Sequence, residues 1–277
     1  MRTLLAVHAH PDDETVTMGG TLARYSAAGV RTVVVTCTDG ELGWQGGLTP
    51  DDQRGRVGGI RLRELEAAAA RLGVSRLVQL GYADSGMAGT ADNVRPGAFW
   101  SASLEEAAAR LAGVLEDERP DVLVAYDETG GYGHPDHRKA HHVTLAAYDQ
   151  LARAARPAKL YLVRIPLGWS RHFVQALRAA GIPAPGSAPT GGDAGPDIAE
   201  VGVPDALVST TIDVRAFVEA KRAALACHAS QFGPQHFLMR MPPALAADLW
   251  ATEFYSRVVP PVAPGQPPET DLLAGLD

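Results

Sequence analysis

Two short segments of the chain combine histidine with aspartate around a proline. The first, HPDDE, spans residues 10–14, and the second, GGYGHPDH, spans residues 130–137. Each directly follows a run of apolar or β-branched residues, which is typical of a buried strand. Imidazole and carboxylate groups are ordinary ligands of divalent metal ions. Because a rigid strand end can present both groups together, the two segments are candidates for one metal site.

The candidate metal ligands in these segments are His10, Asp13 and His137. His10 and Asp13 are three residues apart on the turn that leaves a strand, so both side chains can converge on one point. With His137 as a third ligand, at least one position stays open for water or substrate, as in a catalytic site. In the alternative interpretation, the carboxylates only cap the following helix. The presence of a similar second segment at another strand end favours the metal site.

The same segments contain candidates for acid–base chemistry. Asp12 is adjacent to a ligand, and its carboxylate suits a general base that takes a proton from water. His134 could hold a proton and stabilise an oxyanion. Tyr132 could polarise a carbonyl through its hydroxyl, or it could be a packing aromatic in a glycine loop. Asp136 could orient an imidazole, or cap a helix.

The elements that must position these residues alternate between strands and helices. We expect strands at 3–9, 32–38, 77–80, 122–126 and 159–165, and helices at 15–28, 61–72, 103–115 and 135–154. Such alternation predicts a Rossmann-like α/β fold, a parallel sheet flanked by helices with right-handed crossovers. In the usual strand order 3-2-1-4-5, the first and fourth strands are neighbours, and ligands bind where they meet. Both segments follow these two strands, so the fold should bring them together.

The rest of the chain is expected to complete the same globule. We predict loops at 39–59, 84–100 and 183–204, the last of them mobile, a strand at 208–212, helices at 213–230 and 242–257, and an extended tail from 260. A C-terminal α/β extension (166–277) would thus join the Rossmann-like core (1–165). We find no internal repeat and no independent second domain, so residues 1–277 are interpreted as one domain.

Composition limits the classes of function. The chain has 277 residues, of which 46% are hydrophobic and 21% charged, and its net charge is −7. A mildly acidic surface argues against binding to nucleic acid or to an anionic membrane. No apolar run approaches the roughly 20 residues of a membrane span, and two cysteines are too few for a disulfide framework. We therefore expect a cytoplasmic protein whose partner is a small molecule.

With these motifs the chain resembles the zinc-dependent LmbE-like (PIG-L) N-acetylglucosamine deacetylases. The two metal motifs carry the resemblance, together with VTCT at 35–38, GE at 40–41, DSGMAGT at 84–90 and ETDLLAGL at 269–276. The segment at 84–90 is most similar to the mycothiol-pathway branch, which contains the deacetylase of N-acetylglucosaminyl-inositol and the mycothiol conjugate amidase. The resemblance covers most of residues 1–165 and then thins.

This resemblance implies specific roles in the site. It implies a Zn²⁺ ion at the three ligands named above, Asp12 as the base, and His134 and Tyr132 as the groups that stabilise a tetrahedral oxyanion. Ferrous iron (Fe²⁺) takes the same ligand types, so the resting metal stays open.

The resemblance also implies residues that bind the substrate. It places Arg61 and Asp84 on sugar hydroxyls, where charged groups make strong hydrogen bonds. Met87 lies in a loop at the predicted mouth of the site and could line it. Without the resemblance, Arg61 would be interpreted as a solvated helix residue and Asp84 as a turn former.

The remaining histidines are weaker candidates. His8 lies within the first strand, where a buried histidine is expected to be hydrogen-bonded. His141 and His142 are expected to be surface or packing residues of a helix. His228 is expected to pack at the end of a helix.

The expected reaction is hydrolysis of the acetamide of an N-acetylglucosaminyl conjugate, releasing acetate and a free amino sugar, as in mycothiol or bacillithiol biosynthesis. Three alternatives stay open: an amidase of thiol S-conjugates, a deacetylase of another N-acetyl sugar or antibiotic, and a non-enzymatic, metal-stabilised carbohydrate-binding module. A nucleotide-binding protein is disfavoured, because no GxGxxG turn follows the first strand. Residues 169–208 depart from the family, so the sequence leaves the aglycone open.

Overall fold

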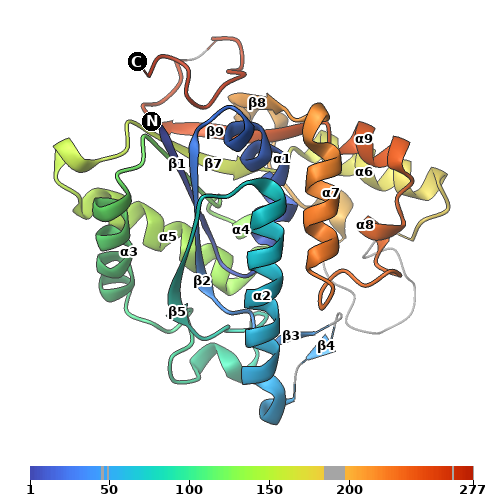
Figure 1. Ribbon diagram of the computed structural model, residues 1–277, viewed down its shortest axis with the longest axis horizontal. Helices are drawn as coiled ribbons and strands as arrows, with labels where there is room; N and C mark the ends of the chain where they lie inside the picture. The colour runs from blue at the N-terminus through green and yellow to red at the C-terminus, as the bar shows by residue number, and fades with distance from the viewer. Residues whose placement is uncertain (45–46, 49, 184–196, 264, 277) are drawn as a thin grey trace.

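A mixed sheet between two layers of helices forms the centre of the molecule (Figure 1). The computed structural model describes the chain except residues 45–46, 49, 184–196, 264 and 277. The sheet has seven strands in the order β5-β2-β1-β6-β7-β9-β8. Five of them are parallel: β1 (Thr3–His8), β2 (Arg31–Thr38), β5 (Arg76–Tyr82), β6 (Val122–Ala125) and β7 (Lys159–Arg164). Their order confirms the predicted arrangement 3-2-1-4-5.

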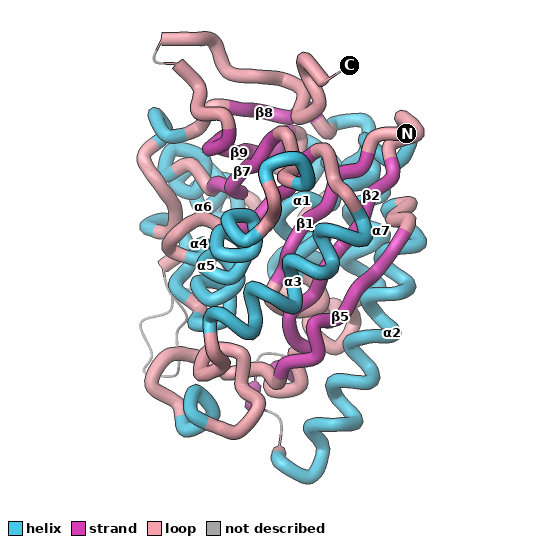
Figure 2. Tube along the Cα trace, turned by 90° about the vertical axis from the view of Figure 1, so that its left-hand side faces the viewer, coloured by secondary structure: helices cyan, strands magenta, loops and turns pink. Residues whose placement is uncertain are grey.

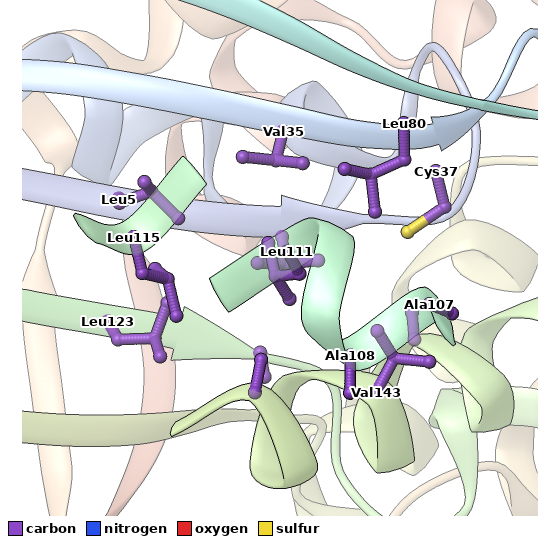
Figure 3. Close-up of a cluster of buried hydrophobic side chains, with 14 of the residues drawn as sticks. Leu5, Val35, Cys37, Leu80, Ala107, Ala108, Leu111, Leu115, Leu123 and Val143 are labelled. Carbon is purple, nitrogen blue, oxygen red and sulfur yellow. The ribbon is translucent and has the colours of Figure 1, made fainter. Parts of the chain in front are cut away.

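Helices cover both faces of the sheet, as a parallel sheet of apolar strands requires. On one face, α3 (Leu104–Glu118) and α5 (Pro135–Gln150) pack against the strands, and Figure 2 looks onto this face. Leu111 of α3 and Leu123 of β6 lie in the cluster of buried side chains that Figure 3 shows. Cys37 lies in the same cluster, fully buried, as a small hydrophobic residue.

The other face is covered by α1 (Asp13–Ala27), α2 (Arg54–Leu72) and α7 (Val218–Cys227). A third cluster joins α7 to α6 (Leu167–Ala179) and α9 (Pro243–Leu249). Short helices follow β6 and α7, namely α4 (Gly130–Gly133) and α8 (Phe237–Arg240). Single 3₁₀ turns lie at 51–53, 91–94, 153–155, 198–200, 205–207 and 215–217.

The C-terminal part extends the same sheet with antiparallel strands. β9 (Thr252–Val259) pairs with β7, and β8 (Thr210–Asp213) pairs with β9. The prediction of one helix over 242–257 is therefore wrong in its second half. Residues 252–259 are rich in β-branched and aromatic residues, and pairing with the open edge of β7 makes them a strand.

Several predicted boundaries also change. α2 begins at Arg54, inside the predicted loop 39–59, and the hairpin of β3 (Gly43–Trp44) and β4 (Gly47–Leu48) occupies more of that loop. Asp213 ends β8 instead of beginning a helix, and its carboxylate accepts the Arg215 N–H at 2.9 Å. Most of the predicted loop 183–204 lies outside the described residues. The predicted extended tail ends in turns over 272–275 and is anchored there, because Leu272 is completely buried.

Among the helices that the structure describes, none is both long enough and apolar enough to cross a membrane.

Candidate metal centre

The two histidine–aspartate segments meet at one edge of the sheet. β1 and β6 are neighbouring parallel strands, with Leu4 opposite Val122. The HPDDE segment follows β1 and runs into the first turn of α1, and the GGYGHPDH segment spans α4 and the first turn of α5. Because the carboxyl ends of parallel strands meet at the same edge, the fold itself brings the segments together.

Three donor groups from these segments, two imidazoles and one carboxylate, face one another in a triangle. His10 Nδ1 lies 3.2 Å from His137 Nε2 and 3.4 Å from Asp13 Oδ2, and His137 Nε2 lies 3.4 Å from Asp13 Oδ1. Zinc–nitrogen and zinc–oxygen bonds measure about 2.0–2.2 Å, so tetrahedral ligand atoms lie about 3.4 Å apart. The spacing of the three donors therefore fits one divalent cation.

The protonation of the two imidazoles supports this fit. His137 Nδ1 lies 3.0 Å from the Gly130 carbonyl oxygen, and His10 Nε2 lies 3.3 Å from Asp136 Oδ2. Both oxygens can only accept, so these two ring nitrogens carry the protons. When both rings are neutral, the other two nitrogens, His10 Nδ1 and His137 Nε2, face each other with lone pairs. A cation between them would satisfy both.

Asp136 lies behind the His10 ring. Its carboxylate is completely buried and accepts the Ser85 N–H at 2.9 Å as well as the His10 ring proton. Such a carboxylate behind a metal-binding imidazole fixes its ring orientation and raises its basicity. Asp136 does not cap α5, which is the alternative role considered for it. The N-cap residue is His134, whose Nδ1 accepts the Asp136 N–H at 3.1 Å.

His134 lies beside the donor triangle. One of its ring nitrogens, with one each from His10 and His137, falls within a group whose atoms are all within 4.8 Å of one another. Burial lowers the pKa of His134, and the neighbouring His10 and His137 lower it further. A neutral His134 with Nδ1 engaged as an acceptor carries its proton on Nε2, so it is a hydrogen-bond donor at the site.

Asp12 combines an unusual backbone with an unusual environment. Its φ of 119° is one of two positive values among the non-glycine residues that the structure describes. Burial raises the pKa of Asp12 to about 7, although the Arg61 guanidinium opposes the rise. A carboxylate that titrates near neutral pH is well matched to a general base.

Arg61 is buried, only 4% exposed, so it is not a solvated helix residue. Its guanidinium donates to the carbonyl oxygens of Gly40 and Pro11, both at 2.7 Å, and lies 3.2 Å from Asp12 Oδ2. Gly40 makes this possible, because a Cβ there would lie 2.5 Å from Arg61 Nη1. The structure thus places Arg61 against the Asp12 carboxylate.

The other predicted site residues differ in their distance from the ligands. Asp84 is buried, accepts the Gly86 N–H at 2.8 Å, and has Oδ1 3.6 Å from His10 Nε2. Tyr132 is 43% exposed, and its ring stands edge-on to His137, with ring centroids 5.1 Å apart. Met87 is 45% exposed on the loop that follows Asp84, and no described contact joins its side chain to the ligands.

Three residues of the site were missed as functional candidates. Asp127 lies two residues after β6, and its Oδ1 accepts hydrogen bonds from the N–H groups of Thr129 and Gly131, at 2.9 and 3.1 Å. Asp127 therefore holds the loop that carries Tyr132. The signal available in the sequence was its position, an acidic residue at the end of the strand.

The other two are Glu14 and His228. Glu14 accepts the Asp12 N–H at 3.0 Å, and its second oxygen lies 3.0 Å from His228 Nε2. His228 is buried at a helix end as expected, but it is paired and not merely packed. In contrast, the expected hydrogen bonds of His8 are absent, since neither ring nitrogen has a partner among the described residues. His8 only makes an edge-on contact with Tyr126.

Comparison with known proteins identifies the family. Residues 5–148 match PIG-L, the GlcNAc-PI de-N-acetylase family. The chain is 42% identical over 288 residues to the 1D-myo-inositol 2-acetamido-2-deoxy-α-D-glucopyranoside deacetylase of Acidothermus cellulolyticus, covering 100% of this chain and 96% of that protein.

Solved structures show the same fold in enzymes with different reactions. The N,N′-diacetylchitobiose deacetylase of Pyrococcus horikoshii has a TM-score of 0.62 at 21% identity, covering 96% of this chain and 88% of its own. The 4-carboxy-2-hydroxymuconate hydratase GalB of Pseudomonas putida KT2440 has a TM-score of 0.60 at 20% identity, covering 96% and 100%. At such identities the likeness concerns the fold alone. Family membership comes from the sequence match and the full-length identity: the chain belongs to the PIG-L (GlcNAc-PI de-N-acetylase) family.

Proposed function

We propose that this protein is a metal-dependent deacetylase whose substrate is 1D-myo-inositol 2-acetamido-2-deoxy-α-D-glucopyranoside. It would hydrolyse the acetamide of this N-acetylglucosaminyl conjugate and release acetate and a free amino sugar, the chemistry of mycothiol biosynthesis. The observation that carries the proposal is the buried triangle of donors beside Asp12, whose pKa is raised to about 7. The 42% sequence identity to the deacetylase of Acidothermus cellulolyticus, which extends over the whole chain, supports the choice of substrate.

His10, Asp13 and His137 would hold the metal ion, and we propose Zn²⁺. Two imidazole nitrogens and one carboxylate at tetrahedral spacing suit zinc, and ferrous iron accepts the same set. When bound, such an ion lowers the pKa of a coordinated water toward about 7 and polarises a carbonyl group. Asp136 would keep the His10 ring in the orientation that binding needs.

Asp12 would act as the general base. It takes a proton from the attacking water, whose oxygen bonds to the acetamide carbon. The C–N bond then breaks, and Asp12 returns the proton to the departing amine. Water is consumed, and the products are acetate and the amine.

His134 and Tyr132 would stabilise the negative charge that develops on the carbonyl oxygen. The donors would be the proton on His134 Nε2 and the hydroxyl of Tyr132, whose ring centroid lies 5.1 Å from that of His137. Donors that are already oriented before the reaction stabilise such charge without further reorganisation.

Asp84 and Arg61 would bind hydroxyl groups of the sugar. Asp84 lies close to His10, and its buried carboxylate would accept strong hydrogen bonds from sugar hydroxyl groups. The guanidinium of Arg61 is held by two carbonyl oxygens next to the Asp12 carboxylate. It would contact the sugar at that position. The exposed side chain of Met87 would lie at the aglycone end.

The test is a panel of N-acetylglucosaminides that differ only in the aglycone: inositol, malate and methyl, with free N-acetylglucosamine. Purified protein should release amine and acetate in a 1:1 ratio, most efficiently from the inositol compound. Removing metal with a chelator should abolish release, and added Zn²⁺ should restore it. A preference for another aglycone would disprove the substrate. Absence of release from every compound, with metal bound, would disprove the deacetylase function.

A further inference from the structure

Asp12 is held in a backbone conformation that aspartate adopts rarely, with φ 119° and ψ −28°. Such a conformation persists only where the surroundings hold it in place. On the C-terminal side, the Asp12 carbonyl accepts the N–H groups of Thr15 and Val16, both at 3.0 Å, where α1 begins. On the N-terminal side, the Asp12 N–H donates to Glu14 Oε2 at 3.0 Å.

Glu14 is itself completely buried and depends on a distant part of the chain. Its Oε1 accepts a hydrogen bond from the Thr15 hydroxyl and lies 3.0 Å from His228 Nε2. His228 is also completely buried and directly follows α7, at a sequence separation of 214 residues. A buried carboxylate is costly without such a partner, so His228 keeps Glu14 charged and fixed in position.

We infer that Glu14 and His228 form a positioning pair, which holds the Asp12 backbone so that its carboxylate is aimed at the attacking water. The inference rests on the proposed function, because it assigns the pair a task in that reaction. The C-terminal extension would then contribute to catalysis through Asp12, without any residue of the pair touching the substrate.

A matched pair of buried charges offers a control for a purely structural role. Lys221 of α7 lies 2.7 Å from Glu253, which also accepts the N–H groups of Gly20 and Thr21 in α1. Lys221 and Glu253 are both 4% exposed. This second pair thus joins the same two helices, but neither member contacts Asp12. If the Glu14–His228 pair only stabilised the fold, disrupting either pair would have the same effect on activity.

The experiment compares Glu14→Ala, Glu14→Gln and His228→Ala with Glu253→Gln, all in full-length, metal-loaded protein. The rate of acetate release from N-acetylglucosaminyl-inositol gives kcat and KM, and metal content and Tm are measured beside them. We expect Glu14→Ala and His228→Ala to lower kcat roughly 10- to 100-fold, with KM within threefold and metal content unchanged. Glu14→Gln should recover part of kcat, because its amide oxygen still accepts the Asp12 N–H. Glu253→Gln should lower Tm but leave kcat within twofold.

Amide hydrogen exchange of the peptide covering residues 10–16 provides a readout that does not depend on activity. Exchange should accelerate in Glu14→Ala and His228→Ala and stay at the wild-type rate in Glu253→Gln. A wild-type kcat in Glu14→Ala, or an equal loss of kcat in Glu253→Gln, would overturn the inference. Unchanged exchange in Glu14→Ala would overturn the anchoring itself. If the wild-type protein released no acetate, the proposed function would fail, while the exchange data would still decide whether the pair holds Asp12.

Discussion

Asp12 and Asp13 are adjacent carboxylates in opposite electrostatic environments. Burial raises the pKa of Asp12 to about 7, and the Arg61 guanidinium, 3.2 Å from Asp12 Oδ2, opposes the rise. Burial alone would also raise the pKa of Asp13, but the imidazoles of His137 and His10 reverse the shift and hold it well below the usual value. Neighbouring carboxylates with divergent pKa values are suited to different tasks, one to proton transfer and the other to metal binding.

This difference predicts opposite phenotypes for two substitutions. Asp12→Asn should lower kcat by roughly 10²- to 10⁴-fold, the usual contribution of a general base, and leave metal content unchanged. Asp13→Asn should release the metal, because it removes one corner of the donor triangle. Metal content by atomic emission and acetate release separate the two. An Asp12→Asn protein with wild-type kcat would contradict the assignment of the base.

Asp136 allows a further prediction for a residue that would not touch the metal. Its carboxylate accepts the His10 ring proton at 3.3 Å. Asp136→Asn should weaken metal affinity by about 10- to 100-fold, because it removes the charge behind the imidazole. Competition with a chromophoric chelator measures the affinity. Asp149→Asn is the control, since its side chain is 77% exposed and does not reach the site. Equal affinities in both variants would show that Asp136 does not act through His10.

At the scale of elements, the loop after β2 and the helix α2 form one unit around Arg61. Gly40 has φ 66°, and a Cβ there would lie 2.5 Å from Arg61 Nη1. Gly97 has φ 82°, but nothing lies within 4 Å of the position that a Cβ would take. Substituting either glycine with alanine imposes a similar backbone strain, so the pair separates strain from steric displacement.

We predict that Gly40→Ala lowers kcat/KM at least tenfold, whereas Gly97→Ala leaves it within twofold. In Gly40→Ala the guanidinium must move away from Pro11 and Asp12, and misplacement of a catalytic group is costly. Both variants should lose about 1–2 kcal/mol of unfolding free energy from the positive φ. Steady-state kinetics and urea denaturation measure the two effects. Equal kinetics in the two variants would mean that Arg61 does not position Asp12.

α1 and β9 are also joined, through hydrogen bonds from the backbone of α1 to the Glu253 side chain of β9. At Met18 the backbone of α1 departs from helical geometry, with φ −146° and ψ 23°. Just after this kink, Glu253 of β9 accepts the N–H groups of Gly20 and Thr21, at 3.0 and 2.7 Å. A carboxylate satisfies backbone donors that the kink leaves without helical partners. β9 thus supplies the cap for a helix that begins more than 230 residues earlier.

Glu253→Ala should therefore be strongly destabilising. It leaves the Lys221 ammonium buried without its partner, and breaking a buried ion pair in this way costs about 3–5 kcal/mol. The double variant Glu253→Ala, Lys221→Met should recover part of this loss, because it removes the unpaired charge. Unfolding free energies from urea denaturation give the comparison. A loss below about 1 kcal/mol in the single variant would show that water reaches Lys221.

For the whole molecule, local patterns predict the parallel part of the sheet and the position of the site. The apolar runs before HPDDE and GGYGHPDH become β1 and β6, and strand order then places both motifs at one edge. What the patterns do not predict depends on distant contacts. β9 is a strand because β7 offers an edge, and His228 reaches Glu14 because α7 packs over α1. No periodicity or motif in the sequence indicates either of these contacts.

The donor triangle also has a consequence for the stability of the whole molecule. In the donor triangle, two imidazole nitrogens and a carboxylate lie 3.2–3.4 Å apart in a largely buried site. A cation that binds only the folded chain adds about 2.7 kcal/mol at 100 times its Kd. For a chain of this size, we predict that chelation lowers Tm by roughly 5–10 °C and that added Zn²⁺ restores it. Calorimetry of the wild type and of Asp13→Asn tests this. The variant should already melt at a lower temperature and respond little to chelator, and an equal response of both proteins would place the stabilising ion elsewhere.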